Sequence, residues 1–204
     1  VQSINDVNTL ANAFFPNLAP ESKGSNSFFN DAAEAALAGV IWRTKESYPE
    51  YCNLAYVTAI LLTKELDSLA EYLTQSEYAS LLSKTFLDGL ASDRQTAAVQ
   101  ATLSNSLRKV VSPEMLFVFS GNDVPLNLND PAKPSVMVLV NHPKYDAVFA
   151  PFLATVAQSA ILQMSERNRH PSVLMLDEAA TLKIPRMERV PATMRSYNIA
   201  TVLG

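Results

Sequence analysis

The chain has 204 residues, of which 48% are hydrophobic and 18% charged, so it can bury a core and is not disordered as a whole. Its formal charge of 16 − 20 = −4 argues against a protein that binds DNA or membranes through bulk positive charge. One cysteine and two histidines exclude an internal disulfide framework and a cysteine-rich zinc module, and they leave little room for a histidine-built metal site.

Residues 1–110 are predicted to form one helix after another. A short helix is expected over Asp6–Phe15, with Asp6 as its cap, and a loop over residues 17–27. Apolar residues then recur with the helical period over Phe28–Tyr48, before Pro49. Leu54–Thr63 is also expected to be helical, because its neighbours are.

Two capping-box patterns predict further helix starts in this part of the chain. Thr74 with Glu77 forms one, and Ser92 with Gln95 forms the other, which opens a helix that runs to about Val110. Residues 1–110 hold 12 acidic and 8 basic side chains, whereas residues 111–204 hold 8 of each. The negative surplus therefore lies entirely in the helical half.

The pattern changes after residue 113. The expected strands, in chain order, are Met115–Phe119, Ser135–Val140, Ser172–Leu176 and Ile199–Leu203. Ser135–Val140 is a continuous apolar run, as expected for a strand buried on both faces, and Ser172–Leu176 is expected to be a second buried strand. Helices are expected over Tyr145–Met164 and Pro185–Tyr197. This alternation of strands and helices predicts a parallel sheet.

A hydrophobic strand that runs into two carboxylates is the sharpest local signal. Residues 173–176 are apolar and are followed by Asp177 and Glu178, which is the Walker B arrangement of P-loop ATPases. Ligands of open α/β sheets bind at the carboxyl ends of the strands. There the first carboxylate can hold Mg²⁺, and the second can orient or deprotonate the attacking water. The alternative interpretation is an exposed helix start, where the helix dipole favours acidic residues.

The usual companion of this motif, a Gly-rich phosphate loop ending in Gly-Lys-Ser/Thr, does not occur in the 204 residues. The sequence begins with Val1 rather than Met and ends just after an apolar strand-like run. We therefore expect a piece of a longer protein, with any phosphate loop upstream. Without that loop, the 204 residues alone are not expected to hydrolyse ATP or to bind it tightly.

Residues 171–204 resemble the TraG/TraD-type coupling proteins of conjugation and type IV secretion. The resemblance rests on Leu-Asp-Glu-Ala-Ala-Thr-Leu at 176–182, on Ile-Pro at 184–185, and on Met-Arg-Ser-Tyr-Asn-Ile at 194–199. Residues 28–33 resemble the start of the family's all-α domain. Residues 115–128, 136–143 and 150–153 resemble the TraG members carried on conjugative transposons. Ala179 departs from the pattern, because a Phe is common there, so a packing contact beside the site is expected to differ.

This resemblance implies an α/β fold, with the partial parallel sheet of a RecA-like P-loop NTPase motor plus an all-α helical domain. Residues 1–17 would lead into the helical domain, 18–112 would form the all-α domain, and 113–204 would form the C-terminal part of the motor domain with Walker B. Asp177 matches the Walker B aspartate that binds the metal and the nucleotide. Glu178 matches the adjacent catalytic glutamate, which also lies at the nucleotide.

Arg195 matches the arginine that, in this family, is thought to reach a neighbouring subunit's nucleotide. A guanidinium there would stabilise charge on the transferring phosphoryl group. The other interpretation of Arg195, which stays open, is a solvated cation at a helix end.

The resemblance also implies the role of the whole protein. It would be an ATPase with ATP and Mg²⁺ as cofactors that links the relaxosome to a type IV secretion channel and drives translocation of single-stranded DNA with an attached relaxase. It would be a homo-hexamer on the cytoplasmic side of the inner membrane, anchored by N-terminal helices, with residues 1–204 in a soluble part. Two alternatives stay open: a non-catalytic interaction module, and another RecA-like DNA-pumping ATPase.

Other residues are weaker candidates. Asn141 and His142, before Pro143, can sense nucleotide or DNA, or simply form a turn. Trp42 and Cys52 are expected in packed positions, and His170 in a loop. A local basic set can face DNA or be ordinary surface charge: Arg167, Arg169, Lys183, Arg186 and Arg189.

Overall fold

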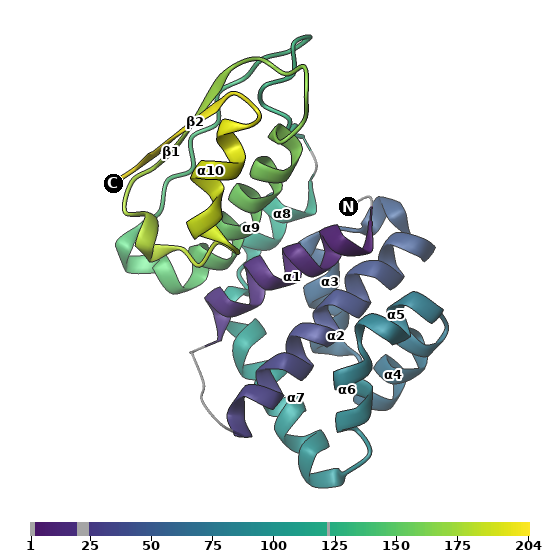
Figure 1. The fold of residues 1–204 in the computed structure, drawn as a ribbon. Helices are drawn as coiled ribbons and strands as arrows, with labels where there is room; N and C mark the ends of the chain where they lie inside the picture. Colours follow the sequence, from purple (N-terminus) through teal and green to yellow (C-terminus); the bar gives the residue numbers. More distant parts are fainter. Residues whose placement is uncertain (1–2, 20–24, 122) are drawn as a thin grey trace. The chain divides into compact units, whose positions relative to one another are not determined.

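The computed structural model describes residues 3–19, 25–121 and 123–204 (Figure 1). The chain divides into two compact units, residues 1–122 and 123–204. The described residues of the first unit form helices and connecting turns, and the second unit combines helices with a two-stranded parallel sheet. The domain limits at residues 17 and 112 stay predictions about the whole protein.

The first unit is built around one central helix. Its helices are α1 (Ile4–Leu18), α2 (Ser25–Ser47), α3 (Leu54–Thr63), α4 (Leu66–Thr74), α5 (Glu77–Leu82), α6 (Lys84–Gly89), α7 (Asp93–Leu107) and α8 (Pro113–Ser120). Figure 1 shows α2 in the middle of this unit, and α2 contacts α1, α3, α5, α6 and α7. Its buried stripe, Ala32, Ala33, Ala36, Leu37 and Val40, has the predicted helical period. The predicted loop over residues 17–27 lies partly outside the described residues, and α1 and α2 occupy its two ends.

The helices begin close to where the sequence predicts, but with different caps. Ser3, not Asp6, caps α1: Ser3 Oγ accepts a hydrogen bond from Asp6 N at 3.2 Å, and Asp6 Oδ2 accepts one from Ser3 N at 2.8 Å. Thr74 is the last residue of α4, and Ser76 caps α5 instead. Ser92 is the N-cap of α7 as predicted, but its side chain makes no capping hydrogen bond.

Gly39 allows α2 to lie close to its neighbours. A Cβ atom at this position would lie 2.8 Å from Ser83 Cβ, 2.9 Å from Leu73 Cδ2 and 3.1 Å from the Ala79 carbonyl oxygen. The first two separations are shorter than van der Waals contact, so the neighbouring helices would have to move.

We expect Gly39→Ala to lower the free energy of unfolding by up to about 2 kcal/mol, the net of about 1–3 kcal/mol of overpacking strain and the gain in helix propensity. Overpacking strain of this size exceeds the gain of about 1 kcal/mol that Ala normally brings to a helix interior. Gly89→Ala is the matched control, because a Cβ there would meet its nearest atoms at 3.5 Å, in ordinary contact. Urea unfolding of both variants measures the difference, and equal stabilities would contradict the packing argument.

Glu34 gives the helical unit a pH-dependent stability. Burial on α2, and secondarily the Asp31 carboxylate, raise the pKa of Glu34 from its ordinary 4.5 to about 7. The folded state therefore holds this proton more tightly than the unfolded state does. The resulting stability is fully present below pH 4.5 and is lost as the pH rises through 7.

Replacing Glu34 by Gln is expected to remove this pH dependence. Because the side chain is partly exposed and screened by solvent, we expect a relative gain for Glu34→Gln of about 1–2 kcal/mol between pH 4.5 and 7.5. The measurement is the free energy of unfolding of both proteins at several pH values. A difference between them that does not change with pH would contradict the prediction.

Trp42 and Cys52 are half-buried rather than fully packed. Trp42 Nε1 donates to Glu46 Oε1 at 2.6 Å, and its ring meets Tyr78 edge-on at 5.8 Å. Cys52 Sγ donates to the Ile41 carbonyl oxygen at 3.6 Å, and burial raises the pKa of its thiol. Both side chains have structural contacts, as predicted.

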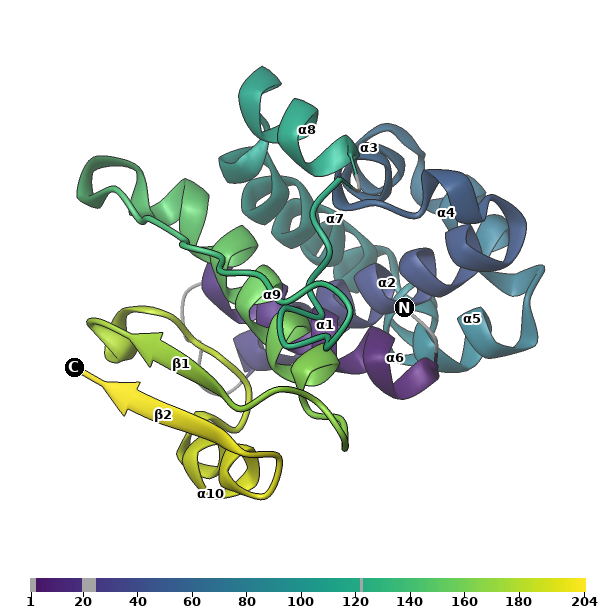
Figure 2. The same cartoon turned by 90° about the horizontal axis from the view of Figure 1, so that it is seen from above.

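The second unit contains α9 (Asp146–Met164), β1 (Ser172–Leu176), α10 (Val190–Arg195) and β2 (Ile199–Leu203). Figure 2 shows β1 and β2 side by side, and they pair in parallel with Ser172 opposite Ile199 and Leu176 opposite Leu203. The prediction that these two runs are neighbouring parallel strands is confirmed. The predicted helix over Pro185–Tyr197 is shorter in the structure, because a 3₁₀ turn precedes α10.

The core of this unit lies on one face of the sheet. It consists of Ala157, Ile161, Met164, Ile184, Val190, Met194 and Ile199. Leu174 and Leu176 of β1 pack against it, whereas Val173 and Met175, on the opposite face, are 59% and 69% exposed. The expectation that β1 is a buried strand is therefore wrong for one of its faces.

Two other predicted strands do not form. Met115–Phe119 lies in α8, where Ser112 Oγ accepts a hydrogen bond from Met115 N at 3.1 Å and Pro113 begins the helix. A Ser-Pro helix start here outweighs the β propensity of the aromatic residues. Ser135–Val140 is neither strand nor helix, and its Val136 side chain is 92% exposed. An apolar run becomes a strand only where a partner satisfies its backbone groups.

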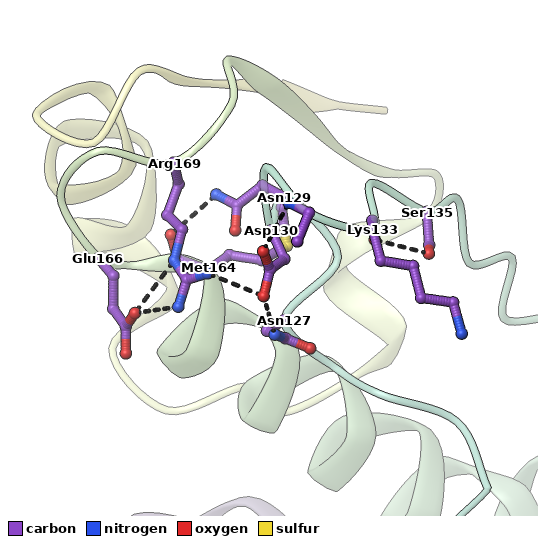
Figure 3. Close-up of polar contacts among 9 residues, drawn as sticks. Asn127, Asn129, Asp130, Lys133, Ser135, Met164, Glu166 and Arg169 are labelled. Atoms are coloured by element: carbon purple, nitrogen blue, oxygen red, sulfur yellow. Dashed lines mark hydrogen bonds and ion pairs between the residues drawn. The ribbon is translucent and has the colours of Figure 1, made fainter.

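A polar network fixes the loop that precedes this segment (Figure 3). Arg169 binds both Asp130, at 3.1 Å, and Glu166. Asn129, which is buried, donates from Nδ2 to the Met164 carbonyl oxygen at 3.0 Å at the end of α9. The backbone N–H of residue 132 and the Arg169 guanidinium hold the pKa of Asp130 below its ordinary value. The loop and the end of α9 are thereby held together.

The segment Pro143–Met164, which includes α9, is long and apolar enough to cross a membrane by length and composition. Of its most apolar window, 56% is buried inside the structure. Ala157, Ile161 and Met164 belong to the core described above. This burial is what a core helix of a globular unit shows.

Candidate nucleotide site

The carboxyl ends of β1 and β2 form one edge of the sheet, and Asp177 and Glu178 leave β1 there. Both side chains are exposed. They follow directly on Leu176, the last residue of β1, as the sequence predicts. The alternative interpretation, an exposed helix start, is met in part, because Glu178 is the N-cap of a short 3₁₀ helix, Ala179–Thr181, although no α-helix begins there.

The backbone turns sharply at this edge. Glu178 has φ 53° and ψ 44°, in the left-handed region that non-glycine residues rarely occupy. Its carbonyl oxygen accepts hydrogen bonds from both N and Oγ1 of Thr181 at 2.9 Å. Asn168, Arg186 and Asn198 share this left-handed conformation, and Glu178 is the one of the four that lies at the carboxyl end of β1.

Gly204 completes the edge and was not a site candidate from sequence. Its N–H donates to the Leu176 carbonyl oxygen at 3.0 Å, and its carbonyl oxygen accepts from Ala179 N at 3.4 Å. A Cβ at Gly204 would lie 2.9 Å from Asp177 Oδ1. Because glycine has no side chain, the Asp177 carboxylate can occupy this space. The contact depends on the register of the two parallel strands, so the sequence alone does not reveal it.

These residues fit a magnesium–nucleotide complex. Mg²⁺ is commonly held by one or two carboxylates together with phosphate oxygens and water rather than by an all-protein cage. The described residues contain no group of three or more His, Cys, Asp or Glu side chains that could hold a metal ion. Asp177 can supply the one carboxylate that such a complex needs, and Glu178, the next residue, can orient or deprotonate a water molecule.

Arg195 does not lie with the two carboxylates. It ends α10, its side chain is exposed, and its carbonyl oxygen accepts a hydrogen bond from Asn198 N at 3.2 Å. The Asn198 carbonyl oxygen in turn accepts from Ser172 N at 3.2 Å, at the beginning of β1. The length of β1, about 13 Å for four residue steps, thus separates Arg195 from the edge that carries Asp177.

The remaining candidates fall in different places. His170 is a loop residue, as predicted, and its N–H donates to the Asn129 carbonyl oxygen at 3.0 Å. Arg169 is bound by two carboxylates, so its charge is already compensated within the unit. Asn141 and His142 form the turn that leads into α9, as one of the two interpretations expected.

A model of the family described as the type IV secretion-system coupling protein DNA-binding domain matches residues 1–204. The chain belongs to this family of coupling proteins. The resemblance to TraG/TraD-type coupling proteins seen in the sequence is thereby confirmed, and with it the assignment to conjugation. A comparison with curated protein sequences finds no match.

Solved structures of the conjugative coupling protein TrwB are similar to the coupling-protein chain over its whole length. An unbound monoclinic form of bacterial TrwBdeltaN70 has a TM-score of 0.71 at 14% identity, covering 100% of this chain and 46% of that one. TrwB in complex with the GTP analogue GDPNP has a TM-score of 0.71 at 15% identity, and the match covers 100% of this chain and 47% of that one. TrwB in complex with ADP and Mg²⁺ has a TM-score of 0.69 at 16% identity, and the match covers 100% of this chain and 46% of that one. The coupling-protein chain thus spans about half the length of these structures and shares their fold.

Proposed function

We propose that residues 1–204 are part of a conjugative coupling ATPase that drives single-stranded DNA with an attached relaxase into a type IV secretion channel. One observation carries this proposal. The coupling-protein family matches the whole chain, and within it two adjacent carboxylates leave the carboxyl end of a parallel strand. TrwB structures with ADP and Mg²⁺, and with nucleotide analogues, support a nucleotide-driven role.

In this proposal residues 113–204 are the C-terminal part of a RecA-like motor domain, and residues 18–112 are an all-α domain that meets the relaxosome. Residues 1–17 lead into the all-α domain. The whole protein assembles as a homo-hexamer and is anchored by N-terminal helices at the cytoplasmic face of the inner membrane. Other parts of the whole motor domain then cover the exposed apolar face of β1.

Each site residue has a distinct task. ATP with Mg²⁺ supplies the phosphoryl group and the divalent cation. Asp177 holds the cation through its carboxylate, directly or through water. Glu178 accepts a hydrogen bond from the attacking water and takes up its proton. Arg195 serves the nucleotide of the neighbouring subunit.

ATP hydrolysis by the whole protein, measured with and without single-stranded DNA, tests this function. We expect DNA-stimulated hydrolysis that Asp177→Asn abolishes, together with loss of DNA transfer between cells. If the whole protein binds relaxase and DNA but releases phosphate only at background rate, the function is wrong. The interaction module would then be the better description.

Gly204→Ala is expected to raise the Mg²⁺ concentration for half-maximal hydrolysis by about 10-fold, because displacing a metal ligand from its support commonly has this effect. The added Cβ would meet Asp177 Oδ1 at 2.9 Å and push the carboxylate aside. Ala200→Val, on the exposed part of the same strand, is the control and should leave the Mg²⁺ dependence unchanged. An unaltered Mg²⁺ dependence in Gly204→Ala would remove Gly204 from the site.

A further inference from the structure

The turn that leads into α9 carries three neighbouring rings at the protein surface, called the ring stack below, whose planes are tilted to one another by 42° and 44°. The ring centroids of His142 and Tyr145 are 5.3 Å apart, and those of Tyr145 and Phe149 are 5.8 Å apart. Lys144 Nζ lies 5.4 Å from the centroid of the Tyr145 ring. His142, Lys144 and Tyr145 are exposed, whereas Phe149 is half-buried and anchors the stack to the helix.

The turn holds these rings in a defined arrangement. Asn141 Nδ2 donates to Asp146 Oδ1 at 2.6 Å, and Tyr145 N donates to the His142 carbonyl oxygen at 2.8 Å. Lys144 N donates to His142 Nδ1 at 3.2 Å, so in the neutral imidazole Nε2 carries the proton and can donate outward. Because the rings are already ordered, a ligand that stacks on them loses little free energy in arranging them.

We propose that His142, Lys144 and Tyr145 form a contact site for single-stranded DNA. A base stacks on Tyr145, in place of Lys144, and the flexible lysine turns to the adjoining phosphate. His142 Nε2 donates a hydrogen bond to the phosphate backbone of the same DNA strand. The inference rests on the proposed function only in taking single-stranded DNA as the substrate. It adds which surface contacts that substrate.

The aromatic cluster of the helical unit fits DNA less well. Residues 42–78 include Trp42 and five tyrosines, but also six acidic and only three basic residues. Negative charge of this density repels phosphates. Around the ring stack the sole acidic side chain within residues 141–149 is Asp146, which Asn141 binds.

Fluorescence anisotropy with a labelled oligo-dT at low salt tests the site on the chain of residues 1–204. We expect Tyr145→Ala to raise Kd by about 10-fold, as removal of one stacking ring does, and Tyr145→Phe to bind like the unchanged chain. Lys144→Gln should raise Kd a few-fold and lower the slope of log Kd against log salt by about 1. Tyr78→Ala, which removes an exposed ring of the helical unit, is the control and should bind normally. Thermal unfolding of each variant checks that it is folded.

Photocrosslinking gives a second readout that does not depend on affinity. An oligonucleotide that carries 5-iodouracil should crosslink to Tyr145, as mapped by mass spectrometry. The proposal is overturned if the unchanged chain does not bind the oligonucleotide, if Tyr145→Ala binds as tightly as Tyr145→Phe, or if crosslinks map elsewhere. ATP hydrolysis by the whole protein tests the proposed function separately. If the whole protein hydrolyses ATP and Tyr145→Ala binds DNA normally, the DNA site proposed here is wrong and the proposed function is unaffected.

Discussion

Replacing Glu178 by Gln in the whole coupling protein is expected to slow ATP hydrolysis by about 100- to 10,000-fold while ATP binding stays intact. Glutamine keeps the length and shape of the side chain but cannot take up a proton from the attacking water. Asp177, which comes directly before it on the same strand end, keeps its carboxylate for the metal ion. Binding of a fluorescent ATP analogue and single-turnover phosphate release separate the two effects.

The backbone at Glu178 offers a control that distinguishes chemistry from folding. Because the residue has φ 53°, Glu178→Gly should relieve strain and raise the free energy of unfolding by about 1 kcal/mol. Both variants should be inactive, and the glycine variant should be the more stable one. Hydrolysis by Glu178→Gln at the unchanged rate would show that this carboxylate does not act on the water.

The sequence predicts the parts of the fold in which local pattern and packing agree. The buried stripe of α2 and the parallel pair β1 and β2 both follow from apolar periodicity and from residues near the element ends. Ser135–Val140 fails because strand formation depends on a hydrogen-bonding partner that a single run cannot reveal. Met115–Phe119 fails because the Ser-Pro start of α8 competes with the preference of aromatic residues for strands.

The candidate site divides in the same way. Asp177 and Glu178 are predictable, because a strand followed by two carboxylates brings them to one edge by covalent connection alone. The part that Gly204 plays cannot be predicted from the sequence, because its closeness to Asp177 depends on the register between two strands. The ring stack at His142 and Tyr145 also needs the structure, because the turn decides which rings meet.

Arg195→Ala is expected to slow hydrolysis by about 1,000-fold or more, as loss of an arginine finger does, with ATP binding retained. The reason lies in its position. Within one subunit Arg195 lies near the beginning of β1, whereas Asp177 and Glu178 lie beyond its end. We therefore expect this exposed arginine to serve the nucleotide of a neighbouring subunit, as proposed above.

Mixing the two inactive variants tests this action between subunits. In the proposed hexamer, assembled from equal amounts of Arg195→Ala and Glu178→Gln, about one interface in four pairs an intact Glu178 with an intact Arg195 of the neighbour. Partial recovery of hydrolysis in the mixture is therefore the expected result, and a mixture of Arg195→Ala with an Arg195→Ala, Glu178→Gln double variant is the control that should not recover. A mixture as inactive as its components, or full activity of Arg195→Ala alone, would leave Arg195 as a solvated cation at the end of α10.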